Sequence, residues 1–305
     1  MAPLGSIPIL GLATLLFAGA FALGVALQHG TTCAVRAMSE VVRDRKAEHL
    51  LGFFECGLWA LLAAWLLIPD MAIPQWQPLV PLCLGAALFG AGATINGGCA
   101  FGSIARLGEG QAQFLLTGAG AYLAFRFLET FGLGAPALQE HAPVPENALL
   151  FVVFGLPGLV LLRFALWRRP LRVVLRLSFL MAVIGIAGTF VGALHQPWPW
   201  MLALRAIGTA NWLTCIALIG LISGSIVNGL FLGRFRLALP KFSALPGRFA
   251  GGLLMGAGGA LIPGGNDSLI LQGIPSGSPL AFLAYGILLT TIVALLLIVP
   301  RFNVH

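Results

Sequence analysis

Long apolar runs, separated by glycine, proline and charged residues, follow one another along most of the chain. A helix needs roughly 20 such residues to cross about 30 Å of hydrocarbon, so the pattern predicts about nine membrane-spanning helices. They are expected at residues 7–28, 50–68, 79–96, 111–128, 148–167, 173–194, 210–230, 249–262 and 280–299. The predicted fold is all-α, a polytopic membrane protein that forms one integral domain in the lipid bilayer.

Composition supports this interpretation and excludes a soluble enzyme. Charged residues make up 9% of the 305 residues, and mean hydropathy is +0.97, whereas a soluble domain carries roughly a quarter charged residues. The net charge of +7 does not indicate a nucleic-acid partner, because the basic residues lie in short loops between apolar runs. Such residues set the orientation of a membrane protein.

The basic loops fall on one side of the membrane in this count, which the positive-inside rule makes cytoplasmic. The opposite side receives Asp70 and the acidic stretch that contains Glu129, Glu140 and Glu146. We therefore expect the N-terminus outside and the C-terminus in the cytoplasm. The loops on the basic side contain Arg36, Arg43, Arg45, Lys46, Arg168, Arg169, Arg172, Arg234, Arg236, Lys241 and Arg248.

The chain also repeats itself weakly. GAALFGAGATINGGCAFGS from Gly85 resembles GGLLMGAGGALIPGGNDSL from Gly251, and the two segments are expected to run in opposite directions. This favours an inverted repeat, with a first half at residues 1–145 and a second at 146–305. The run at 50–68 has no counterpart, and glycine-rich apolar segments also align by chance or serve helix packing. The sequence leaves these interpretations open.

Two segments, Gln28–Arg36 and Asn96–Ser103, have glycine before a cysteine, which predicts that one helix ends and a short one begins. Unpaired backbone N–H groups at membrane depth require a polar cavity. The start of a helix favours an anion there. We therefore expect an anion site near the middle of the membrane, framed by broken or re-entrant helices.

A neutral thiol is a weak, polarizable donor suited to sulfur, and nearby arginines could neutralise an anion. In the second half, Asn266 stands where Cys99 stands in the first, and Asp267 is either solvated at the outer mouth or functional. Ser223–Gly229 offers small polar groups after the seventh run. The candidate substrate-binding residues are Thr32, Cys33, Arg36, Asn96, Gly97, Gly98, Cys99, Arg106, Asn228, Asn266 and Asp267.

Several residues have a simpler interpretation. Cys56, Cys83 and Cys215 lie in ordinary apolar runs and are expected to pack as small hydrophobes; that alternative stays open for Cys33 and is less favoured for Cys99. Long side chains near the ends of apolar runs are expected to reach the headgroups, and tryptophans at a boundary to anchor the interface. These are Glu55, Arg126, Arg163, Trp198 and Trp200. No metal-ligand spacing, cofactor motif or catalytic triad is found.

Around Cys33 and Cys99 the chain resembles the YeeE/YedE family of bacterial membrane proteins, which includes thiosulfate-uptake transporters. NGGCAFGS with the following RLGEG, Asn96 to Gly110, carries the resemblance, and Gly30–Cys33 adds a weaker match. The resemblance implies an hourglass-shaped inner-membrane protein that passes a sulfur compound along cysteines. It also implies Cys33 and Cys99 as relay residues, and a small cytosolic sulfur-carrier protein as partner.

Family transporters usually have a Gly-Cys segment in the second half also, where this chain has Gly265-Asn266-Asp267. One relay thiol is therefore missing or replaced, which leaves thiosulfate, a related sulfur-containing anion or another small solute as substrate. Uptake of a small sulfur-containing anion is the expected function. The alternatives are an intramembrane thiol enzyme or redox relay, with Cys33 or Cys99 as nucleophile, and an assembly subunit whose cysteines only pack.

Overall fold

The protein is described by a computed structural model. It covers residues 8–30, 32–68, 70–74, 76–133, 139–167, 170–207, 211–238, 240 and 242–299, with the backbone alone at 70–74 and 139–143.

Each of the nine apolar runs forms a helix, with ends within four residues of the predicted ones. Seven described stretches are long and apolar enough to cross a membrane, if α1 is counted with α2 and α4 with α5. Two helices, α6 and α11, are shorter, with 16 and 17 residues. The nine are α1 (Ile9–Gly30), α3 (Glu48–Leu67), α4 (Leu79–Asn96), α6 (Leu115–Thr130), α7 (Ala148–Trp167), α8 (Leu171–Leu194), α10 (Trp212–Phe231), α11 (Leu245–Leu261) and α13 (Pro279–Ile298).

Shorter elements interrupt or join these helices. They are α2 (Ala34–Asp44), α5 (Ala100–Gly108), α9 (Trp200–Ala206), α12 (Asn266–Ser268), the π-helical η5 (Leu269–Gly273), and the 3₁₀ turns η2 (Ala112–Phe114) and η4 (Phe242–Ala244). Two short strands in the connections, β1 (Asp70–Pro74) and β2 (Gln139–Pro143), pair antiparallel with Ala72 opposite His141. The predicted all-α membrane fold with broken helices is confirmed.

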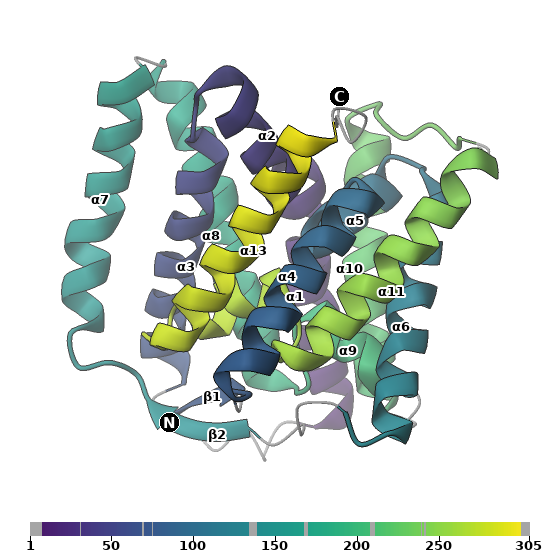
Figure 1. The fold of residues 1–305 in the computed structure, drawn as a ribbon. Helices are drawn as coiled ribbons and strands as arrows, with labels where there is room; N and C mark the ends of the chain where they lie inside the picture. The colour runs from purple at the N-terminus through teal and green to yellow at the C-terminus, as the bar shows by residue number, and fades with distance from the viewer. Residues whose placement is uncertain are drawn as a thin grey trace.

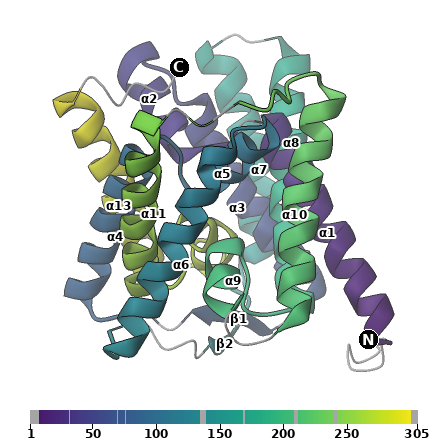
Figure 2. The same cartoon turned by 90° about the vertical axis from the view of Figure 1, so that its right-hand side faces the viewer.

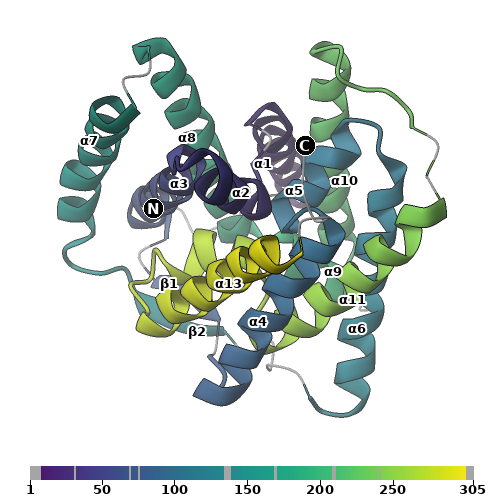
Figure 3. The same ribbon diagram turned by 45° about the horizontal axis from the view of Figure 1, so that its top comes forward.

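The helices form two groups with short helices between them. One group contains α3, α7 and α8, and the other contains α4, α6 and α11 (Figures 1 and 3). The first helix packs along α8 and α10, and α13 packs along α4 and contacts α2. Between the groups, α5 contacts α1, α2, α10 and α12, and α12 also contacts α9. This arrangement brings the broken segments of both halves of the chain together.

Glycines let the helices approach closely. A Cβ at Gly24 would lie 2.0 Å from the Leu221 carbonyl oxygen, so α1 and α10 are in backbone contact there. A Cβ at Gly92 would lie 2.7 Å from the Gly251 carbonyl oxygen, between α4 and α11. Small residues are the usual means of helix packing in lipid, where apolar burial provides little drive.

The two ends of the bundle differ. The β1–β2 pair and the start of α1 lie at its lower end, whereas α2, the connection from α10 to α11 and the end of α13 lie at its upper end (Figures 1 and 2). Basic residues of the upper connections therefore share one end, as the sequence predicts. Arg168, Arg169 and Lys241, predicted for the same end, lie outside the described residues.

Two expectations about side chains were wrong. Glu55 and Arg163 do not reach headgroups: each is 1% exposed, and their side chains form an ion pair of 2.5 Å. Trp198 and Trp200 are not surface anchors, because they are 1% and 5% exposed within the core. Glu55 and Arg163 lie on different helices, α3 and α7, so a local pattern does not reveal their pairing.

Candidate substrate site

Helix α4 ends at the predicted glycines. Gly97 has a φ of 69°, in the left-handed region that favours glycine. The Gly98 N–H donates to the Ala93 carbonyl at 3.0 Å, which is the closing bond of a Schellman motif. Two residues later α5 begins at Ala100. The Asn-Gly-Gly sequence therefore stops one helix and permits another to start almost at once.

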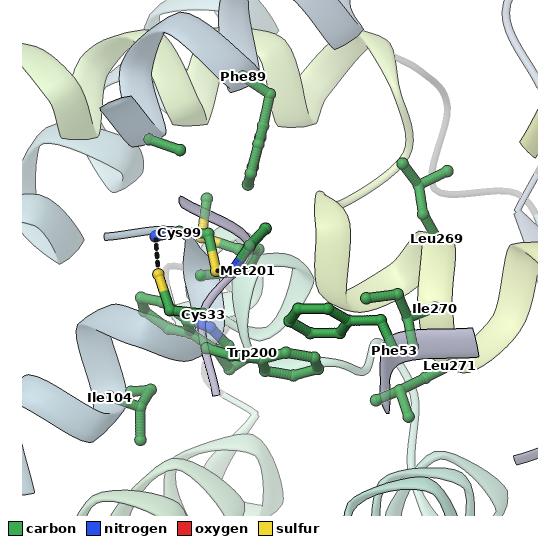
Figure 4. Packing of buried hydrophobic residues seen from close by; sticks show 14 of the residues in the cluster. Cys33, Phe53, Phe89, Cys99, Ile104, Trp200, Met201, Leu269, Ile270 and Leu271 are labelled. Atoms are coloured by element: carbon green, nitrogen blue, oxygen red, sulfur yellow. Dashed lines mark hydrogen bonds between the residues drawn. The ribbon is translucent and has the colours of Figure 1, made fainter. Parts of the chain in front are cut away.

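Cys33 and Cys99 both occupy the position just before a short helix, α2 and α5 respectively. The Ala34 N–H at the start of α2 donates to Sγ of Cys99 at 3.1 Å. In return, the Cys99 N–H donates to Sγ of Cys33 at 3.4 Å (Figure 4). The two thiols also lie within hydrogen-bonding reach of each other. The starts of two helices thus face each other, with a sulfur atom accepting from each.

The second half of the chain contributes Asn266, the first residue of α12. Its Oδ1 accepts from the Ala100 N–H at 3.2 Å, and its Nδ2 donates to Sγ of Cys99 at 3.5 Å. The carboxamide therefore contacts both the thiol and the start of α5. The sequence alignment that set Asn266 against Cys99 pairs two residues that meet in space.

Asp267 is fully buried, so it is not solvated at a membrane mouth. Its Oδ2 accepts from the Met201 N–H near the start of α9 at 3.2 Å, while its Oδ1 has no hydrogen-bond partner. The Thr32 hydroxyl, next to Cys33, is also buried without a partner. Buried polar atoms of this kind are costly unless something binds them.

Apolar side chains close the site in this conformation. Phe89 of α4 and Trp200 and Met201 of α9 lie around the cysteine pair (Figure 4). Cys33 is 8% exposed and Cys99 is fully buried. An anion could pass between the two cysteines only if one of these short elements moved.

Asn96 supports the break and is already fully bonded. Its Nδ2 donates to the Gly98 carbonyl at 2.6 Å and to Oγ of Ser103 at 3.0 Å. Its Oδ1 accepts from the Thr117 hydroxyl at 2.7 Å. Asn96 therefore ties α4 to α5 and α6, and it has little capacity left for a ligand.

Three other predicted residues lie outside the cysteine pair. The segment with Asn228 is part of the continuous α10, and the Asn228 amide donates to Oε1 of Gln28. Arg36 is exposed on α2, where its charge interacts with Glu40. Arg106, at the far end of α5, lies 4.0 Å from Glu109. No group of three His, Cys, Asp or Glu side chains within the described ranges is placed to hold a metal ion.

The chain matches a known protein family over most of its length. A family model described as "Sulphur transport" matches residues 29–218 and 209–294, which include both cysteines and the broken helices of both halves. The chain belongs to this sulphur-transport family. The resemblance to YeeE/YedE proteins is thereby confirmed.

A relative supports the same assignment. The thiosulfate transporter TsuA of Spirochaeta thermophila is 28% identical over 298 residues, which cover 84% of this chain and 89% of that protein. The family and this relative are transporters, and the present chain is accordingly a membrane protein of sulfur-compound transport.

Two further residues of this sulphur-transport protein lie near the site and were not predicted as site residues from the sequence. Tyr285 of α13 is 3% exposed, its hydroxyl has no hydrogen-bond partner, and it lies near Cys99. Arg248 of α11 lies beside the α4 break, since a Cβ at Gly97 would be 2.8 Å from its Nη1. Both lie more than a hundred residues from Cys99 in the chain, and no local motif marks them.

Proposed function

We propose that the protein takes up a small sulfur-containing anion of the thiosulfate type through a constriction formed by Cys33 and Cys99. The observation that supports this most is the exchange of N–H···S bonds between the starts of α2 and α5. Sulfur atoms already occupy the acceptor positions at two helix starts, which is where a terminal sulfur of the anion would bind. The relative named as a thiosulfate transporter supports the same substrate class.

The chemistry of passage follows from these bonds. Moving a bare dianion into hydrocarbon costs tens of kcal/mol, so donors must replace its hydration. As the anion enters, its sulfur accepts from the Ala34 and Cys99 N–H groups in place of the thiols. The neutral thiols then turn to donate to it. Ionised thiols would repel the anion, so the mechanism requires them to stay protonated.

Asn266 takes the position that a third thiol has in other family members. Its Nδ2 points at Sγ of Cys99 in the closed state, and a carboxamide N–H is a stronger donor to oxygen than a thiol is. We assign it to the oxygen end of the anion. The unpartnered hydroxyl of Thr32, next to Cys33, and the unpartnered Oδ1 of Asp267, next to Asn266, add buried polar atoms near this site.

The membrane potential sets a further requirement. It opposes entry by about 2.3 kcal/mol per charge at 100 mV, or roughly 4.6 kcal/mol for a dianion. Net uptake into a bacterial cytoplasm therefore requires a co-transported cation or rapid removal of the anion inside. A small cytosolic sulfur-carrier protein would provide such removal.

A thiol enzyme or redox relay is the second candidate, favoured by the contact between the two thiols. In that case the thiolate of Cys33 or Cys99 would attack the outer sulfur of thiosulfate, and a persulfide would form as the S–S bond of thiosulfate breaks and sulfite leaves. Such a thiol must ionise and must be reached by water. The buried, apolar surroundings in Figure 4 favour transport over this alternative.

The test is uptake of radiolabelled thiosulfate and sulfite into proteoliposomes by the parent protein, Cys99→Ser and Cys215→Ser. We expect Cys99→Ser to lower the initial rate at least tenfold, because the hydroxyl is a poorer partner for sulfur. Cys215→Ser should stay within twofold, because Cys215 is exposed on the outer surface of α10. Unchanged uptake by Cys99→Ser would remove the thiol from the mechanism. A persulfide on Cys99, with no uptake by the parent, would favour the enzyme.

A further inference from the structure

A second polar feature lies at the upper end of the bundle, where the basic loops gather. It is a pocket of about 740 Å³ between the end of α5 and the connection from α10 to α11. Its charged and amide-bearing lining residues are Glu109, Gln111, Gln113, Arg234, Arg236 and Arg248. The volume is in the range of ordinary small-molecule sites.

The pocket carries excess positive charge. Its acid, Glu109, already lies 4.0 Å from Arg106 and accepts from the Gln111 amide at 3.1 Å. None of the three pocket arginines forms a salt bridge within the part of the chain that the structure describes. Unpaired guanidinium groups converging on a pocket attract oxyanions, which they bind with paired N–H bonds.

Contacts with neighbouring elements fix the positions of two of these arginines, Arg236 and Arg248. The Arg236 N–H donates to the Glu109 carbonyl at 3.0 Å, and the Ala238 N–H donates to the Gly110 carbonyl at 3.2 Å. These bonds fix the α10–α11 connection against the end of α5. The Arg248 guanidinium lies 4.4 Å above the centre of the Phe114 ring, an attractive cation–π contact.

Arg248 also connects this pocket to the cysteine pair. Its Nη1 would be 2.8 Å from a Cβ at Gly97, so a side chain at Gly97 would displace it. Gly97 is two residues before Cys99, at the break between α4 and α5. Arg248 and Cys99 therefore both lie at the same short break.

We infer that this arginine pocket is a second binding site, for small divalent oxyanions such as thiosulfate and sulfate. The site holds the anion after it has left the cysteine pair toward the basic end of the protein. Its place in transport rests on the proposed function, whereas its binding of an oxyanion does not. Guanidinium groups recognise the oxygen atoms, so this site does not need the sulfur atom that the thiols recognise.

The experiment is equilibrium binding of radiolabelled thiosulfate and radiolabelled sulfate to the purified full-length protein in detergent. The variants are Arg236→Gln and Arg248→Gln, each made in the parent and in a Cys33→Ser/Cys99→Ser background. Arg172→Gln is the matched control, because it removes an exposed positive charge at the same end of the bundle, at the start of α8.

We expect the double cysteine variant to retain binding of both anions, and each pocket substitution in that background to weaken it about tenfold. Arg172→Gln should change it less than twofold. Loss of all binding in the double cysteine variant, or unchanged binding in Arg236→Gln and Arg248→Gln, would overturn the pocket site. Retained sulfate binding without thiosulfate uptake by the parent would instead contradict the transport function and leave the pocket site standing.

Discussion

At the scale of single residues, the unusual feature is that two cysteine sulfurs accept backbone N–H groups at helix starts. Serine, threonine, asparagine and aspartate are the residues that usually precede a helix, because their oxygen atoms accept from its first N–H groups. Here each cysteine lies just before one helix, and its sulfur accepts an N–H group at the start of the other helix. The site thus joins two helix starts through sulfur, and it can exchange one sulfur acceptor for another.

The closeness of the two thiols gives a direct prediction. Treatment with copper phenanthroline should join Cys33 and Cys99 in a disulfide, because the oxidant takes one electron from each thiol and each thiol releases one proton. Uptake should fall by at least tenfold and return after dithiothreitol, because the bond locks the constriction. Mass spectrometry of the digested protein checks for the linked peptide.

The control for this experiment is Cys33→Ser, which should keep its remaining activity after oxidation. Cys215, exposed on α10, reports whether the reagent reached the protein. Oxidation of Cys215 without any Cys33–Cys99 peptide would show that the two thiols do not meet.

Some of this site could be predicted from the sequence. Asn-Gly-Gly before Cys99 indicates the break, since glycine in the left-handed region stops a helix. The weak repeat also set Asn266 against Cys99. Arg248 and Tyr285 could not be found, because contact with the break depends on how α11 and α13 pack against α4. The continuity of α10 through Asn228 could not be predicted either, because small polar residues match a helix interface as well as a broken segment.

At the scale of elements, α7 differs from the other helices. It lies at the edge of the molecule and packs mainly against α3 and α8 (Figure 1). Most of its large apolar side chains are exposed, as expected for a surface facing lipid. In its buried part, Arg163 pairs with Glu55 of α3 at 2.5 Å and donates to the Ser178 hydroxyl of α8 at 3.3 Å. These polar contacts attach α7 to the bundle.

Breaking this ion pair should destabilise the protein. Arg163→Met leaves the Glu55 carboxylate buried without its partner, which costs about 3–5 kcal/mol. The midpoint of thermal unfolding in detergent should fall by roughly 6 °C or more. The double variant Glu55→Met/Arg163→Met removes both charges and should recover most of the loss.

Arg126→Met is the matched control for this prediction. Arg126 pairs with Glu129 at 2.8 Å, but its side chain is 47% exposed, and exposed pairs contribute at most about 1 kcal/mol. An Arg163→Met midpoint no lower than that of Arg126→Met would show that the ion pair does not attach α7.

The elements themselves were largely predictable because hydrocarbon imposes a length and a composition on each spanning helix. What the apolar runs could not reveal are the short elements. Helix α9 has seven residues and follows Pro197 and Pro199, a pattern that indicates a loop. The interfacial role expected of Trp198 and Trp200 was wrong because both side chains are buried in the core of the bundle.

At the scale of the whole molecule, charge is distributed unequally between the two ends of the bundle. The end that contains α2 and the α10–α11 connection also contains the arginine pocket. The end of α6, whose last turn contains Glu129, and the start of α7, which follows Glu146, lie at the other end (Figures 1 and 2). Basic residues are retained on the cytoplasmic side during insertion. The same charges would then attract an entering oxyanion toward the cytoplasmic side of the constriction. The basic residues would therefore serve both membrane insertion and transport.

This distribution predicts the orientation of the protein in a bacterial inner membrane, and labelling can measure it. Asp44→Cys and Glu146→Cys form a matched pair, because each replaces an exposed acid at an opposite end of the bundle. In a background whose five native cysteines are replaced, a membrane-impermeant maleimide should label Glu146→Cys in intact cells. Asp44→Cys should react only after the membrane is permeabilised. The reverse pattern would place the arginine pocket outside, and it would then collect the anion before the cysteines instead of receiving it after them.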